Sequence, residues 1–258
     1  MKDLFGNPIQ ERMTLQQAVN LSLDRLKTFE PPEGYWLADS GGRDSCVLLY
    51  LAKMAEVKFE AVYSVTTIDP PELIYFLRQH HHDTKWDRPK KPFLSMLLDR
   101  GFPLRTNRWC CNEYKERSGH GRRILLGVRW EESQRRATRK MVEQCYKDSS
   151  KTYVNPIIDW DQRHVWDFIH SEKIHYCSLY DEGFKRIGCV MCVYNYSRQE
   201  EAKRWPRFKL NFERAFIALY EKNKHRPSYQ RWKNGIEMFD WWLSKKPCAK
   251  EQQVMIFG

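Results

Sequence analysis

The chain has 258 residues, of which 41% are hydrophobic and 30% charged, so it contains enough apolar material for a sizeable core, which argues against global disorder. Its 44 Lys and Arg residues exceed its 33 Asp and Glu residues and give a net charge of +11, which favours an anionic partner. The apolar runs are too short to span a bilayer and residues 1–6 lack a signal-like apolar stretch, so we expect a cytoplasmic protein with no membrane partner.

The spacing of apolar residues predicts strands that alternate with helices over most of the chain. Thr14 and Gln17 have the spacing of a capping box that opens a helix over 15–27. A strand over 35–38, a glycine turn and a helix over 46–52 follow. Further strands are expected over 59–65, 124–128 and 151–157, with helices over 72–80 and near 165–169, the last capped by Asp161. This alternation is typical of a mostly parallel α/β sheet with helices on both faces.

Beyond residue 198 the pattern changes to two helices, around 208–219 and 232–243, separated near Pro227. We therefore expect three parts, namely a helical segment over 1–33, an α/β domain over 34–198 and a helical extension over 199–258. Basic residues between the aromatic ones of the extension suit either a solvated face or a nucleic-acid backbone. Consecutive side chains point in different directions, so His80, His81 and His82 are expected to form a solvated helix end. A homo-oligomer stays open.

A candidate phosphate site lies between the first strand and the next helix, in the sequence Ser-Gly-Gly-Arg-Asp-Ser from Ser40 to Ser45. Gly41 and Gly42 allow the backbone to approach an anion closely, and the terminal serines and the helix N-terminus can donate to phosphate oxygens. Arg43 adds positive charge, and Asp44 is a candidate ligand for Mg²⁺. The alternative is an ordinary tight turn, and the P-loop pattern of nucleoside triphosphatases is absent.

The eight cysteines of a chain expected in a reducing compartment favour metal ligands, catalytic thiols or buried apolar residues over disulfides. Cys110 and Cys111 are adjacent, and Cys189 and Cys192 form a C-x-x-C pair. Because adjacent side chains diverge, the set suits a [4Fe–4S] cluster, in which each thiolate binds a different iron, better than one Zn²⁺ ion. Zn²⁺, and buried or redox-active thiols without a metal, stay open. Cys46, on the apolar face of its helix, is expected in the core.

The glycine turn resembles the S-G-G-x-D-S turn of the PP-loop adenine nucleotide α-hydrolase superfamily, whose members bind ATP or an adenylyl sulfate. A longer series of motifs resembles the phosphoadenosine phosphosulfate (PAPS) and adenosine phosphosulfate (APS) reductase family. The series includes Cys110-Cys111 and the segments 127–136, 155–160, 165–169 and 179–192. The cysteine pairs are similar to those of cluster-bearing APS reductases and of DndC-like DNA phosphorothioation proteins.

This resemblance implies a PP-loop, PAPS reductase-like domain over 34–198 with a cysteine-ligated metal site at Cys110, Cys111, Cys189 and Cys192. The residues implied to bind nucleotide are Ser40, Gly41, Gly42, Arg43, Asp44, Ser45, Ser64, Thr66, Gly127 and Arg129. Among them, Ser64 and Thr66 lie in the backbone segment that would receive the adenine. The residues implied to be catalytic are Asp44, Arg129, Glu132 and Arg136. Both arginines would face the anionic part of the nucleotide, and the alternative is an exposed helix start with ion pairs.

One departure from the reductases shapes the functional expectation. They carry a C-terminal Glu-Cys-Gly-[Leu/Ile]-His motif whose cysteine attacks sulfur, whereas the tail Lys245–Glu251 has only Cys248. We therefore expect an iron–sulfur ATP pyrophosphatase that uses ATP and Mg²⁺ to adenylate an acceptor for sulfur incorporation. A nucleic acid would be the acceptor, in thiolation or phosphorothioation, and a partner protein would donate sulfur. The alternatives are an APS/PAPS reductase that uses Cys248 and a non-catalytic nucleotide sensor with a structural metal site.

Overall fold

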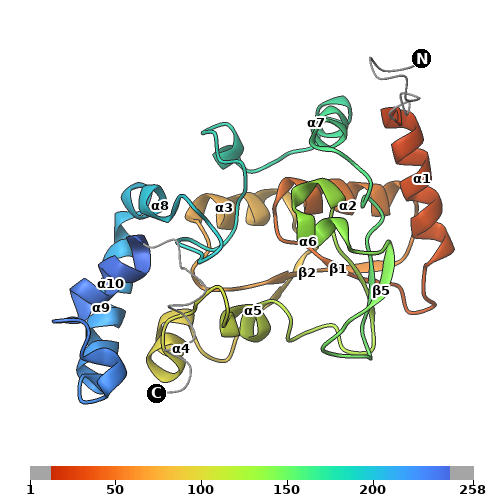
Figure 1. Cartoon of the computed structure of the whole chain (residues 1–258). Helices are drawn as coiled ribbons and strands as arrows, with labels where there is room; N and C mark the ends of the chain where they lie inside the picture. Colours follow the sequence, from red (N-terminus) through yellow and green to blue (C-terminus); the bar gives the residue numbers. More distant parts are fainter. Residues whose placement is uncertain (1–12, 245–258) are drawn as a thin grey trace, which may run out of the picture. The chain divides into compact units, whose positions relative to one another are not determined.

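A computed structural model of the chain describes residues 13–244 (Figure 1). Cys248, the nucleophile of the reductase alternative, lies outside the described residues. Within 13–244, no helix combines the length and the apolar character needed to cross a bilayer. The helices and strands are α1 (Leu15–Thr28), β1 (Tyr35–Ala38), α2 (Arg43–Met54), β2 (Phe59–Ser64), α3 (Pro71–His80), β3 (Lys85–Asp87), α4 (Phe93–Arg100), α5 (Trp109–Tyr114), β4 (Arg123–Leu125), α6 (Gln134–Ala137), β5 (Val142–Gln144), β6 (Thr152–Val154), α7 (Gln162–Ser171), α8 (Arg198–Arg204), α9 (Pro206–Asn223) and α10 (Gly235–Ser244).

The six strands form one sheet in the order β3-β2-β1-β4-β6-β5. Strand β1 pairs in parallel with β2 and with β4, β4 pairs in parallel with β6, and only the pairing of β5 with β6 is recorded as antiparallel. The predicted mostly parallel α/β fold is therefore confirmed. The order of the strands reverses at β1, and ligands of open α/β sheets bind at the carboxyl ends of the strands at such a switch point. The turn 40–45 follows β1 directly.

The described residues divide into two compact units. The first comprises 13–63, 80–85 and 119–177, and the second comprises 64–79, 86–118 and 178–244. In the first unit α1, α2 and α7 pack together, and the core includes the fully buried side chains of Leu37, Leu48 and Trp160. The predicted division at residues 33 and 198 stays a prediction.

The second unit has an aromatic core. The ring of Phe212 on α9 lies 5.7 Å from that of Phe93 on α4 and 5.7 Å from that of Trp242 on α10. The two predicted C-terminal helices are present as α9 and α10, and they cross closely, because a Cβ atom on Gly235 would lie 2.4 Å from the Cα atom of Ile217. The stacked rings and this close crossing fix α4, α9 and α10 as one packed layer of the second unit.

Side-chain caps set the starts of two helices as the sequence predicts, whereas two strands are shorter than predicted. Thr14 and Gln17 form the predicted capping box, and Asp161 caps α7 by accepting the His164 N–H at 2.8 Å. The strands predicted over 124–128 and 151–157 are shorter, as β4 and β6 show. The prediction of a solvated histidine run is wrong for His81, which is 7% exposed, because it folds inward after α3 ends and pairs with a buried carboxylate.

Candidate nucleotide turn and thiol cluster

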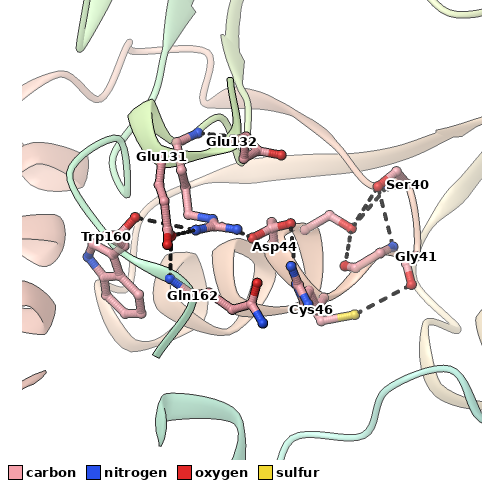
Figure 2. Close-up of polar contacts among 12 residues, drawn as sticks. Ser40, Gly41, Asp44, Cys46, Glu131, Glu132, Trp160 and Gln162 are labelled. Carbon is pink, nitrogen blue, oxygen red and sulfur yellow. Dashed lines mark hydrogen bonds and ion pairs between the residues drawn. The ribbon is translucent and has the colours of Figure 1, made fainter. Parts of the chain in front are cut away.

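The turn from Ser40 to Ser45 is held together by its own hydroxyl groups. The N–H and the hydroxyl of Ser40 donate to Oγ of Ser45 at 3.2 and 3.1 Å (Figure 2). The Ser45 hydroxyl in turn donates to the Gly42 carbonyl at 2.8 Å. Gly41 has φ +68°, a conformation that favours glycine, and donates its N–H to Oδ1 of Asp39 at 3.0 Å. Helix α2 begins at Arg43, and no side chain caps its N-terminus at Gly42. The first N–H groups of the helix therefore suit an anion.

Arg43, which was expected to add positive charge to the turn, is 9% exposed. Its guanidinium lies 5.4 Å from the ring centre of Trp166 on α7, a distance typical of a cation–π contact. The role of Arg43 in phosphate binding stays a prediction, and the contact with Trp166 shows that the side chain also joins α2 to α7.

Asp44, in the first turn of α2, is held by a buried arginine from the segment after β4. Arg129 is 2% exposed, and its Nε donates to Oδ1 of Asp44 at 2.7 Å. A terminal nitrogen of the same guanidinium donates to Oε2 of Glu131 at 2.9 Å and to the Trp160 carbonyl at 3.4 Å. Figure 2 shows Asp44, Glu131 and Trp160 around this guanidinium. Three contacts thus hold the guanidinium within the protein, and it fixes the carboxylate of Asp44 in place.

The same network includes the other residues predicted to be catalytic. The backbone N–H of Arg129 donates to Oε2 of Glu132 at 2.9 Å, and the Glu132 carboxylate is paired with Arg136. The four residues Asp44, Arg129, Glu132 and Arg136 therefore lie in one continuous chain of polar contacts. The alternative of exposed ion pairs fits Arg136, whose side chain is 35% exposed, but not the buried Arg129. Glu131 was missed, because nothing distinguishes its sequence position from that of an exposed acid.

Burial and charge set the electrostatics of this network. Burial raises the pKa of Asp44, and the Arg129 charge opposes that increase. Gly127 is required for the approach of its segment to α2, because a Cβ atom there would lie 3.0 Å from the carbonyl carbon and oxygen of Asp44. Mg²⁺ bound with a nucleotide takes one or two carboxylates and phosphate oxygens, and Asp44 fits this requirement.

The four paired cysteines lie in the second unit and are all free thiols. The pKa of Cys110 is raised by its hydrogen bond with Cys111, by burial, and by the charges of Cys111, Cys189 and Cys192. The pKa of Cys111 is lowered by the same hydrogen bond and then by the charge of Arg108. The thiol of Cys110 is therefore close enough to those of Cys111, Cys189 and Cys192 for their charges to affect its pKa.

The four cysteines offer the donor atoms of a metal centre but not the arrangement of a single-ion site. Across residues 13–244, no three His, Cys, Asp or Glu side chains are arranged as ligands of a metal ion. Soft thiolate donors are nevertheless those of iron–sulfur clusters, where each of four cysteines holds its own iron. The cysteines fit a cluster in number and chemical type, and their role as metal ligands stays a prediction.

A buried glutamate supports the C-x-x-C loop, and no sequence pattern indicates it. Met191, between the two cysteines, has φ +55°, and its N–H donates to Oε2 of Glu201 at 2.7 Å. The other oxygen of Glu201 accepts from the Asn195 side chain at 2.5 Å. Glu201 is 5% exposed, and burial raises its pKa to about 7. The carboxylate therefore holds a strained backbone conformation.

Ser64 and Thr66, which were expected to bind adenine, belong to the second unit. Thr66 is 2% exposed, its N–H donates to Oδ2 of Asp69 at 3.1 Å, and its side chain hydrogen bonds with Cys189. Thr66 is thus tied to the cysteine-bearing loop, and the adenine-binding role of both residues stays a prediction.

The strand–turn–helix at the switch point of a mostly parallel sheet defines an α/β protein of the class whose ligands bind at this edge. Two solved structures share this fold. One is PAPS reductase from Candida auris, with a TM-score of 0.53, 17% identity and coverage of 70% of this chain and 98% of that one. The other is FMN adenylyltransferase from Candida glabrata, with a TM-score of 0.51, 16% identity and coverage of 69% and 63%.

Residues 34–195 match the phosphoadenosine phosphosulfate reductase domain, and the chain belongs to this family. APS reductase of Bacillus cereus is 28% identical over 171 residues, which are 60% of this chain and 71% of that protein. An uncharacterized protein of Methanocaldococcus jannaschii is 31% identical over 169 residues, 60% of this chain. The chain spans 35% and 40% of the length of two M. jannaschii relatives that it matches.

We expect Arg129→Lys to lower the free energy of unfolding by about 1–3 kcal/mol, because one ammonium cannot reproduce the forked contacts to Asp44 and Glu131 and a buried carboxylate loses its partner. Urea unfolding measures the loss. Arg163→Lys is the matched control, since the side chain of Arg163 is 58% exposed and lies 3.9 Å from Asp161, and it should change stability by less than about 0.5 kcal/mol. Equal effects of the two changes would contradict the central role of Arg129.

The pKa of Glu201 predicts a pH dependence of stability. The folded pKa of about 7 exceeds the ordinary value of 4.5, so the folded state holds this proton more tightly, and the stabilisation that results is lost as the pH rises from about 4.5 to 7. The change is roughly 3 kcal/mol, and Glu201→Gln should remove it. Urea unfolding at pH 5 and pH 8 tests this, with Glu200→Gln, at a side chain that is 70% exposed, as the control. Parallel pH profiles of wild type and Glu201→Gln would refute the assignment.

Proposed function

We propose that this chain is an ATP pyrophosphatase of the PAPS reductase-like family, which adenylates an acceptor for sulfur incorporation. ATP with Mg²⁺ is the substrate of the turn from Ser40 to Ser45. A nucleic acid, thiolated or phosphorothioated, is the acceptor, and the net charge of +11 supports an anionic partner of this kind. A separate protein supplies the sulfur.

The position of Asp44 carries this proposal. It lies in the first turn of a helix that follows a glycine turn at the switch point of the sheet, and Arg129 and Gly127 fix it there. Such a turn provides N–H donors and the positive end of a helix dipole for phosphate groups. A single carboxylate beside them suits Mg²⁺ bound to a polyphosphate, so the arrangement supports ATP as the ligand.

The chemistry proposed for the turn is adenylyl transfer. An acceptor oxygen attacks the α-phosphorus of ATP, the bond from that phosphorus to the bridging oxygen of the β-phosphate breaks, and pyrophosphate leaves with the electron pair. N–H groups of the turn donate to the leaving pyrophosphate as its charge develops, and Asp44 would hold a Mg²⁺ ion that would supply further neutralising charge. Sulfide from the donor protein then displaces AMP, which forms a carbon–sulfur or phosphorus–sulfur bond.

We infer that Cys110, Cys111, Cys189 and Cys192 hold a [4Fe–4S] cluster, with Zn²⁺ as the alternative. When bound, a cluster would supply iron that delivers sulfur or organises the site. The four free thiols and the effect of Cys111, Cys189 and Cys192 on the pKa of Cys110 support the inference, and so does the loop conformation of Met191, which Glu201 stabilises. The chain's own contribution is to hold the thiols as two fixed pairs in one unit.

A sulfonucleotide reductase is the second candidate, because one relative with 71% of its length matched bears the name APS reductase. The reaction of a reductase needs a cysteine that attacks the sulfur of the substrate. Cys248 is the candidate for that cysteine, and its neighbours differ from the Glu-Cys-Gly-[Leu/Ile]-His motif. The residues around Cys248 therefore support the ATP pyrophosphatase over the reductase.

Incubation of anaerobically purified protein with ATP labelled at the α-phosphate, Mg²⁺, inorganic sulfide and either tRNA or duplex DNA should yield AMP and pyrophosphate. Asp44→Asn should lower the rate about hundredfold, because the carboxylate that holds Mg²⁺ loses its charge. Asp167→Asn, which alters an exposed carboxylate on α7, is the matched control and should leave the rate unchanged.

The same preparation distinguishes the alternatives. Sulfite released from APS or PAPS in the presence of a thiol reductant, without AMP formation from ATP, would establish the reductase in place of the pyrophosphatase. Tight ATP binding without turnover of either substrate would establish a nucleotide sensor.

Iron and sulfide analysis tests the thiol cluster. The anaerobic protein should contain about four iron and four sulfide per chain, and Cys189→Ser should retain less than about half of the iron, because one ligand is lost. Cys145→Ser is the matched control, because Cys145 lies in the first unit and its Sγ accepts a hydrogen bond from Tyr153 at 3.1 Å. One zinc per chain without iron would replace the cluster with the Zn²⁺ alternative.

A further inference from the structure

A buried carboxylate lies directly under the glycine turn, in a region for which the proposed function assigns no role. Asp39 is the residue between β1 and the turn, and it is 1% exposed. Its Oδ2 lies 2.5 Å from Nδ1 of His81 and accepts the Thr84 hydroxyl at 2.8 Å. Its Oδ1 accepts the Gly41 N–H at 3.0 Å. His81 and Thr84 are 7% and 6% exposed, so water has little access to this group of side chains.

A buried carboxylate near an anion site is unfavourable in two ways, because it loses its hydration and its charge repels phosphate. Burial alone would raise the pKa of Asp39, but the hydrogen bond and charge of His81, together with the Gly41 N–H and the Thr84 hydroxyl, reverse that effect and lower the pKa. Asp39 is therefore a carboxylate whose charge is compensated by local donors. One of those donors, the Gly41 N–H, is part of the phosphate turn.

The group resembles a nucleophile with its base, because Nε2 of His81 lies 3.8 Å from Sγ of Cys46. Two observations exclude nucleophilic chemistry by this thiol. Cys46 is 2% exposed, and burial raises the pKa of its thiol well above the ordinary value, so the reactive thiolate is not formed. The contact with Cys46 instead packs the imidazole ring against the first turns of α2.

We propose that Asp39 is a positioning residue of the phosphate turn. Held by His81 and Thr84, its carboxylate binds the Gly41 N–H and fixes the left-handed conformation at Gly41, so that the N–H groups that open α2 face the phosphate. His81 and Thr84 act through Asp39 and come from the segment that follows α3. The inference rests on the proposal that this turn binds the phosphates of a nucleotide.

Binding measurements with two ligands test the role of Asp39. Asp39→Ala, which removes the acceptor of the Gly41 N–H, should weaken the binding of ATP with Mg²⁺ about tenfold, and the binding of adenosine by less than about twofold. Asp39→Asn keeps an oxygen that can accept this N–H, so its affinity for ATP should stay within about threefold of wild type. Thr84→Val, which removes one donor from the carboxylate, should weaken ATP binding about threefold, and Thr84→Ser should restore it.

The matched control is Asp159→Asn. Asp159 belongs to the same unit and pairs with Arg25 through two contacts at 2.8 and 2.7 Å, so its loss should lower stability without changing the ratio of ATP to adenosine affinity. Equal losses for ATP and adenosine in Asp39→Ala, or unchanged ATP affinity in Asp39→Ala, would show that Asp39 does not position the turn.

A second measurement needs no nucleotide. Amide hydrogen exchange followed by NMR should show Gly41 exchanging at least about tenfold faster in Asp39→Ala than in wild type, while Leu51 in the middle of α2 is unchanged. Unchanged exchange at Gly41 would refute the positioning role. If wild type binds no adenine nucleotide but Gly41 exchanges faster in the variant, the proposed function fails and the control of the turn by Asp39 stands.

Discussion

The buried guanidinium of Arg129 fixes the start of α2, and the candidate nucleotide turn depends on that helix. A charge removed from water has to be paired, so Arg129 draws together Asp44, Glu131 and the carbonyl of Trp160. These groups come from three separate segments of the first unit. Once they meet, the helix start cannot shift along its axis without breaking an ion pair, and the turn before it has a fixed end.

The same principle operates at both candidate sites. A buried carboxylate accepts a backbone N–H from a residue with positive φ, Asp39 from Gly41 in the turn and Glu201 from Met191 in the C-x-x-C loop. Such conformations persist only where surrounding contacts enforce them. The carboxylates supply that enforcement, and each is in turn held by further donors from its own unit. Each unit thus contains a loop whose backbone conformation is held by a buried carboxylate.

The parts that could be predicted from the sequence are those with short-range causes. The capping box at Thr14 and the cap at Asp161 depend on residues three positions apart, and the glycine turn depends on six consecutive residues. The paired cysteines needed only their spacing. His81 was misjudged and Glu201 was missed, because a buried polar residue is recognisable only from the partner that neutralises it. The partners of these two residues lie 42 and 10 residues away in the chain, with no local pattern to indicate the pairing. Glu131 is half exposed, and nothing in the sequence separates it from any other exposed acid.

The sequence by itself determined the α/β class, the position of the turn after β1 and the family, because periodicity, glycine placement and motif order are properties of neighbouring residues. Only the tertiary structure decided that Arg129 supports Asp44 from inside the protein, that His81 turns inward and that Glu201 holds the backbone of the C-x-x-C loop. These outcomes follow from burial. The free energy of a charged group depends on whether water or a paired side chain surrounds it, and only the folded chain sets those surroundings.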